Sequence, residues 1–237
     1  MKELMRLDKY LADMGAGTRS EVKLFIKKGR VQVNNEVVTD ANRKIETGSD
    51  IVCLDGRDIS YVHYEYFMLN KPAGVLSATE DKRAETVIDL ITTSKRKDLF
   101  PVGRLDKDTE GLLLITNDGA LTHSLLSPKK HVDKKYYAKV EGVVTEEDIE
   151  LFSKGLQVDD EFLAMPAKLT ILSQGELSEI ILIIQEGKFH QVKRMFEAVG
   201  KTVVYLKRLS MGSLQLDESL QPGEYREVTE EELALLR

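Results

Sequence analysis

A run of nine residues, Gly103–Gly111, holds five charged side chains between two glycines: Arg104, Asp106, Lys107, Asp108 and Glu110. An ionised carboxylate in such a loop can act as a covalent nucleophile, and several carboxylates together can hold magnesium. The cationic side chains interleaved with the acids disfavour a metal site, although spacing alone does not exclude one. A solvated connection whose charges serve solubility is the remaining interpretation.

Two apolar segments flank this loop and are predicted to position it. Leu99–Val102 has the pattern of a short strand, and Leu112–Thr116 has the pattern of a buried strand. The sheet would then fix both ends of the loop. Because binding and catalytic residues concentrate on loops held by a rigid scaffold, the sequence favours chemistry here.

The run Gly103-Arg104-Leu105-Asp106-x-Asp108-Thr109-x-Gly111-Leu112 resembles the catalytic motif of the RNA pseudouridine synthases. It is most similar to the branch with an N-terminal S4 domain, the RsuA-like enzymes. The resemblance implies that Asp106 is the nucleophile and that Arg104 fills the gap left when the target uridine leaves its stack. It also implies an isomerisation that needs no cofactor.

Two later segments extend the resemblance. Gly187–Phe196 is similar to the last motif of the family, where a basic residue pairs with the catalytic aspartate. Lys193 occupies that position, and Arg194, also expected to bind substrate, is the alternative partner. Lys134–Val140 is predicted to be a strand, and its Lys-x-Tyr resembles the element whose tyrosine, here Tyr136, stacks on the target base. From the residues alone, a tyrosine on a strand is more often part of a core.

Asn70–Gly74 is similar to the first motif of the family, which packs under the loop that carries the nucleophile. Its proline and glycine predict a turn after a strand over Tyr64–Leu69. A structural role is favoured for this motif over a chemical one.

The first 60 residues form a basic module. Residues 1–44 contain ten Lys and Arg against six Asp and Glu, a net charge of +4 within a chain of net charge −6. Apolar spacing from Leu4 to Met14 predicts one helix, and Thr18-Arg19-Ser20-Glu21 is a capping box for a second. With the hairpin around Asn34-Asn35, this arrangement resembles an S4 RNA-binding domain. The resemblance implies phosphate contacts by Arg19, Lys23, Lys27 and Arg30; an amphipathic helix with a solvated face is the alternative.

Composition narrows the classes of protein. The chain has 237 residues and a single cysteine, Cys53, so a disulfide framework is excluded and a cytoplasmic protein is expected. No apolar run reaches the length of about 18 residues that a membrane span needs, and no secretory signal is recognised. The four histidines lack ligand-like spacing, so no metal site is expected.

Together these features predict an α+β protein with two domains. Residues 1–60 would form an S4 domain of the αL type, and residues 61–237 a pseudouridine synthase domain on a large, mainly antiparallel mixed sheet with flanking helices. Short helices are expected over Thr86–Ile91, after Asn117–Gly119, after Thr145 and after Thr229.

The resemblance also suggests a substrate. The chain length and Gln221–Arg226 resemble the small-subunit enzyme, so 16S ribosomal RNA or a small-subunit assembly intermediate is the expected partner, and a monomer is expected. Action on 23S rRNA is the main alternative. A metal-dependent RNA phosphotransfer enzyme and a non-catalytic S4 protein are further alternatives.

Overall fold

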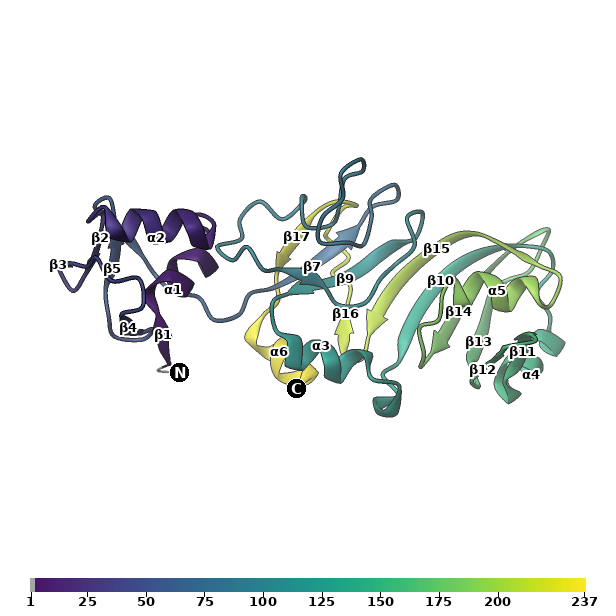
Figure 1. The fold of residues 1–237 in the computed structure, drawn as a ribbon. Helices are drawn as coiled ribbons and strands as arrows, with labels where there is room; N and C mark the ends of the chain where they lie inside the picture. The colour runs from purple at the N-terminus through teal and green to yellow at the C-terminus, as the bar shows by residue number, and fades with distance from the viewer. Residues whose placement is uncertain (1–2) are drawn as a thin grey trace. The chain divides into compact units, whose positions relative to one another are not determined.

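The computed structural model describes residues 3–237 (Figure 1). Contacts divide the chain into two compact units. The first contains the residues up to Glu65 together with Thr92–Leu99, and the second contains Tyr66–Ile91 and Phe100–Arg237. The predicted boundary between residues 60 and 61 stays a prediction, because contacts alone do not define which part folds independently.

The first unit packs two helices on short strands. Its elements are β1 (Leu4–Arg6), α1 (Leu7–Asp13), α2 (Arg19–Lys27), β2 (Val31–Val33), β3 (Glu36–Val37), β4 (Lys44–Glu46), β5 (Val52–Leu54) and β6 (Arg57–Ile59). The strands pair as β1-β4 and as a sheet in the order β3-β2-β5-β6. The predicted capping box is confirmed: the Thr18 hydroxyl accepts from the Glu21 amide at 3.3 Å, and the Glu21 carboxylate accepts from the Thr18 amide at 2.8 Å.

The first predicted helix is wrong at its start. Leu4–Arg6 pairs antiparallel with Lys44–Glu46, and the helix begins only at Leu7. The apolar spacing was real, but the backbone amides before Leu7 find partners on a strand some 40 positions later, which local periodicity does not record.

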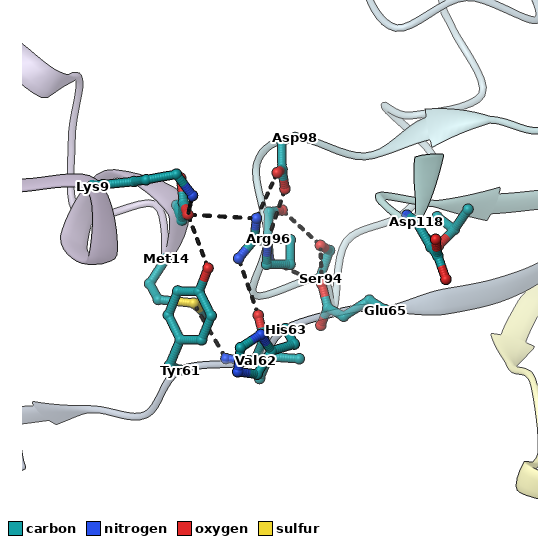
Figure 2. A network of polar contacts seen from close by, with 12 residues as sticks. Lys9, Met14, Tyr61, Val62, His63, Glu65, Ser94, Arg96, Asp98 and Asp118 are labelled. Atoms are coloured by element: carbon teal, nitrogen blue, oxygen red, sulfur yellow. Dashed lines mark hydrogen bonds and ion pairs between the residues drawn. The ribbon is translucent and has the colours of Figure 1, made fainter. Parts of the chain in front are cut away.

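Segment Thr92–Leu99 joins the first unit through Arg96, whose side chain is buried (Figure 2). The guanidinium bonds Asp98 at 2.5 and 2.8 Å and lies 3.7 Å from Asp13 of α1. It also donates to the Val62 carbonyl and lies over the Tyr61 ring. A segment from the middle of the sequence is therefore part of the N-terminal unit.

Nine strands form one mixed sheet in the second unit (Figure 1). The order is β13-β14-β10-β15-β9-β7-β17, with β16 beside β15 and β8 beside β9. All pairs are antiparallel except β9 with β15, which confirms a mainly antiparallel mixed sheet. The strands are β7 (Tyr66–Lys71), β8 (Phe100–Pro101), β9 (Glu110–Thr116), β10 (Lys134–Glu141), β13 (Lys168–Ser173), β14 (Leu177–Ile184), β15 (Thr202–Met211), β16 (Leu214–Gln215) and β17 (Tyr225–Glu227).

Helices and one small hairpin accompany this sheet. They are α3 (Gly119–Leu126), a 3₁₀ turn (Pro128–Lys130), α4 (Glu146–Lys154), the hairpin β11 (Leu156–Asp159) and β12 (Phe162–Ala164), α5 (Gln191–Glu197) and α6 (Glu230–Leu236). Helix α5 contacts both β15 and β11. The fold is α+β, as predicted.

The predicted helix over Thr86–Ile91 is wrong. The amide and hydroxyl of Thr86 donate to the Asp89 carboxylate, and the Val87 amide donates to the Leu76 carbonyl. These bonds stabilise an isolated β-bridge between Leu76 and Thr86, followed by turns. Helix nucleation is costly, so a segment as short as this one does not form an α-helix by itself.

Candidate active site

Loop Gly103–Gly111 connects β8 to β9, and its two strands are hydrogen-bonded to each other. The predicted scaffold is therefore present. Gly111 is required where the loop enters β9, because its φ is +98° and an added Cβ would lie 2.2 Å from the Arg208 carbonyl oxygen. This close approach allows the parallel pairing of Gly111 with Arg208 on β15.

Lys71, at the end of β7, holds the loop from below. Its side chain is fully buried, and its ammonium donates to the carbonyls of Pro72, Lys107 and Thr109 at 2.9, 3.2 and 2.9 Å. The expectation that Asn70–Gly74 packs under the loop is confirmed. Burial lowers the pKa of Lys71 to about 8, although the charges of Asp108, Asp106 and Glu110 oppose this shift.

Lys193 on α5 bridges two carboxylates of the loop. Its Nζ lies 2.7 and 2.8 Å from the two oxygens of Asp108 and 3.4 Å from Asp106 Oδ2. Burial opposes the charged form of Lys193, but the hydrogen bond to Asp108 and the charges of both aspartates raise its pKa overall. The hydrogen bond from Lys193 lowers the pKa of Asp108. The two aspartates of the loop therefore share one ammonium partner.

His190 is the second group beside Asp106, and the sequence analysis did not single it out. Its Nε2 lies 3.6 Å from Asp106 Oδ1. The residue has φ 49° and ψ 31°, a left-handed conformation that is uncommon outside glycine. The signal available in the sequence was its place in the Gly187–Phe196 run, three residues before Lys193.

Asp106 and Tyr136 line one small hollow, which we call the inner hollow. Its lining is Arg104, Leu105, Asp106, Thr109, Tyr136, Ile184, Gly187, Lys188, His190, Gln191, Val192 and Leu206. Tyr136 is buried on β10, whereas Tyr137 points away and contacts Tyr205. The structure therefore brings together the predicted Arg104, Asp106 and Tyr136, with Lys193 against Asp106.

The inner hollow has a volume of about 60 Å³. This volume holds about two waters at ~30 Å³ each. It is well below the ~300 Å³ or more that small-molecule sites usually offer. A nucleoside can enter only if side chains at its rim move. Arg104 is exposed and the His190 side chain is 41% exposed, so these two are placed to do so.

Arg194 does not contact Asp106. Its guanidinium bonds the Asp159 carboxylate, lies 5.1 Å from the centre of the Phe162 ring and donates to the Phe189 carbonyl at 3.3 Å. Of the two candidate partners of Asp106, the geometry selects Lys193. The expected substrate contact by Arg194 stays a prediction, because its guanidinium already neutralises a carboxylate.

The four predicted phosphate-binding residues lie in the first unit. Arg19, Lys23 and Lys27 are exposed on α2, with Lys23 3.9 Å from Asp8. The Arg30 guanidinium forms a bidentate pair with Asp55 and lies 4.2 Å from the centre of the Phe25 ring.

Within residues 3–237, no group of three or more His, Cys, Asp or Glu side chains gathers as a metal site. The same residues include no helix long and apolar enough to cross a membrane.

Comparison with known proteins identifies both parts of the chain. Residues 65–198 match the RNA pseudouridylate synthase family, and residues 5–51 match the S4 domain. An uncharacterized RNA pseudouridine synthase of Bacillus subtilis strain 168 is 50% identical over 98% of both chains. Ribosomal small subunit pseudouridine synthase A of Escherichia coli strain K12 is 41% identical over 97% of this chain and 99% of its own.

A solved structure agrees with these matches. The crystal structure of a pseudouridylate synthase aligns with 98% of this chain and 100% of its own, at 36% identity and a TM-score of 0.69. Family, fold and domain content all agree, and the chain therefore belongs to the S4-domain branch of the RNA pseudouridine synthases and is an enzyme of that kind.

Proposed function

We propose that this enzyme converts one uridine of 16S ribosomal RNA to pseudouridine, with Asp106 as the nucleophile. The observation that carries the assignment of Asp106 is its position: its carboxylate lines the inner hollow beside Tyr136, and the Lys193 ammonium lies 3.4 Å away. Asp108, in contrast, has an exposed side chain that both hydrogen bonds from Lys193 already engage.

Each neighbouring group has a role in this proposal. Removing a uridine from a folded RNA costs a few kcal/mol, and Arg104, exposed at the rim, fills the vacated place in the stack. The buried ring of Tyr136 holds the uracil by its face. The Asp106 carboxylate then adds to the substrate, the bond between uracil N1 and the ribose breaks, and the ring turns.

The ring is rejoined to the ribose through C5, and the bond between Asp106 and the substrate breaks, which returns the carboxylate. The proton lost from C5 is balanced by the one gained at N1. The product is an isomer of the substrate, so no oxidant, reductant or cofactor is consumed. Lys193 keeps a positive charge beside Asp106 throughout, because its own pKa is raised.

The choice of 16S rRNA rests on the relatives. Ribosomal small subunit pseudouridine synthases A from Escherichia coli and Vibrio vulnificus strain CMCP6 are each 41% identical over at least 97% of both chains.

The test is a map of pseudouridine in both ribosomal RNAs from cells that lack this gene. We expect one position of 16S rRNA to lose pseudouridine and to regain it with the wild-type gene but not with Asp106→Asn. Loss at a 23S position instead would overturn the substrate, and restoration by Asp106→Asn would overturn the nucleophile.

A further inference from the structure

Phe189 is an exposed aromatic ring beside the inner hollow. It exposes 71% of its surface and stacks on His190, with ring centres 3.7 Å apart and planes 19° from parallel. The left-handed backbone of His190 holds this stack at the start of α5. Backbone strain of this kind is retained where surrounding structure and function require it.

The stack separates two hollows. His190 lines the inner hollow. Phe189 lines a larger open one, which we call the outer hollow, of about 560 Å³. Lys188 lines both. The stacked rings of Phe189 and His190 would therefore separate a group bound in the outer hollow from a group bound in the inner hollow.

The outer hollow has the size of a ligand site and an acidic, aromatic lining. Its residues are Asp159, Asp160, Glu161, Phe162, Lys188, Phe189 and Arg194. Asp159 accepts the amides of Glu161 and Phe162 at 3.0 Å and pairs with Arg194, which fixes the turn. Arg194 is thus a positioning residue for this wall.

The charges of this lining indicate what fits. Asp160 and Glu161 add negative charge, which repels a phosphate, whereas Lys188 at the boundary attracts one. Carboxylates accept hydrogen bonds from the amino groups of adenine, cytosine and guanine, which uracil lacks. An exposed aromatic face stacks on any base.

We propose that the outer hollow binds one unpaired nucleobase of the RNA substrate, the neighbour of the target uridine, stacked on Phe189. Bases that carry an amino group are preferred over uracil, because Asp160 and Glu161 accept from that group. The proposal rests on the proposed role of Asp106 in one respect: it identifies the bound base as the neighbour of the uridine that Asp106 attacks.

The chain contains no tryptophan, so Phe189→Trp gives a single fluorescent reporter. We expect a short single-stranded oligouridylate containing one adenosine or cytidine to quench it, and to bind at least about tenfold more tightly than oligouridylate alone, as a hydrogen bond to a charged acceptor requires. Leu235→Trp on α6 is the matched control, because Leu235 is also 71% exposed. Equal quenching of both reporters would overturn the site.

The acidic residues have their own test in the same reporter. Asp160→Asn with Glu161→Gln should remove the preference for amino-bearing bases while leaving quenching intact. A preference that persists would show that these carboxylates do not contact the base.

Kinetics place the site on the reaction path. Phe189→Ala should raise KM for the RNA substrate by about tenfold, within the range of a lost base stack, and leave the rate at saturating RNA within about twofold. Phe189→Tyr should restore KM.

The increase in KM caused by Phe189→Ala should vanish on a substrate that is abasic at the neighbouring nucleotide. An undiminished increase on that substrate would contradict the proposal. If the assignment of 16S rRNA or of Asp106 were wrong, the fluorescence result would be unchanged. Failure of the proposed function can therefore be distinguished from failure of the proposed base-binding site.

Discussion

The Lys193 ammonium is hydrogen-bonded to both carboxylate oxygens of Asp108, at 2.7 and 2.8 Å. The resemblance to the family predicted a pair between Lys193 and Asp106, and that contact is present but longer, at 3.4 Å. One lysine therefore pairs with two aspartates, and Asp108, the more exposed of the two, accepts the shorter bonds. The arrangement leaves the Asp106 carboxylate less constrained than that of Asp108.

Asp106→Asn and Asp108→Asn separate these two roles. We expect Asp106→Asn to lower single-turnover formation of pseudouridine by more than about a thousandfold, because an amide is not a nucleophile. Asp108→Asn should stay within about tenfold of wild type, because exposed ion pairs contribute about 1 kcal/mol or less. The measurement uses saturating RNA and checks binding separately. Comparable losses in the two variants would remove the distinction.

Gly111→Ala should destabilise the second unit strongly. The new Cβ would lie 2.2 Å from the Arg208 carbonyl oxygen at a φ of +98°, so β9 and β15 must separate. We expect a loss of about 3 kcal/mol or more in the free energy of unfolding. Gly119→Ala is the control, because no atom lies within 4 Å of its added Cβ. Urea unfolding measures the stability of both variants. Similar unfolding midpoints would contradict the close approach of Gly111 to the Arg208 backbone.

Lys71 should make stability depend on pH. Its folded pKa of about 8 lies below the usual 10.5, so the unfolded chain binds more protons between these values and stability rises with pH there. The full difference corresponds to about 3 kcal/mol. We expect the unfolding free energy of wild type, relative to Lys71→Met, to increase from pH 7 to pH 10. A difference that stays constant would show that Lys71 is not titrating in this range.

Arg96→Ala should loosen the first unit even though residue 96 lies far from it in sequence. Its loss removes the hydrogen bonds to Asp98 and to the Val62 carbonyl and the ion pair with Asp13. Asp98 is half exposed and Asp13 keeps its contacts with Lys9 and Tyr61, so we expect a cost of about 1–3 kcal/mol. Amide hydrogen exchange in α1 reports the effect. Lys95→Ala, an exposed neighbour, is the control; equal exchange in the two variants would show that Arg96 does not anchor this segment.

Arg19, Lys23 and Lys27 should provide electrostatic affinity for RNA. Replacing all three with alanine should weaken binding and reduce the slope of log affinity against log salt by about 2, at about 0.7–0.9 for each lost phosphate contact. Lys44→Ala, an exposed cation on β4 of the same unit, tests for a general charge effect. An unchanged slope in the triple variant would show that these residues do not touch phosphate.

The same variant also tests the division of labour between the two units. The rate at saturating RNA should change little, because Asp106, Tyr136 and Lys193 belong to the second unit. A collapsed rate with intact binding would show that α2 helps to position the target uridine.

The sequence by itself determined the features that local pattern records. The capping box of Thr18 and Glu21 and the turn at Asn34-Asn35 follow from neighbouring residues, as does the alternation of buried and partly buried side chains along β10. The long motifs around Asp106 and Lys193 identified the family for the same reason: their information lies within runs of about ten residues.

Only the tertiary structure decided which distant groups meet. Lys71 bonds carbonyls more than 30 positions away, Arg194 bonds Asp159, and Arg96 joins a unit that ended in sequence at Glu65. The predicted helix over Thr86–Ile91 failed because Leu76 accepts one of its amides. Such bonds depend on how strands are ordered in the sheet, and local periodicity fixes the faces of a strand but not its neighbours.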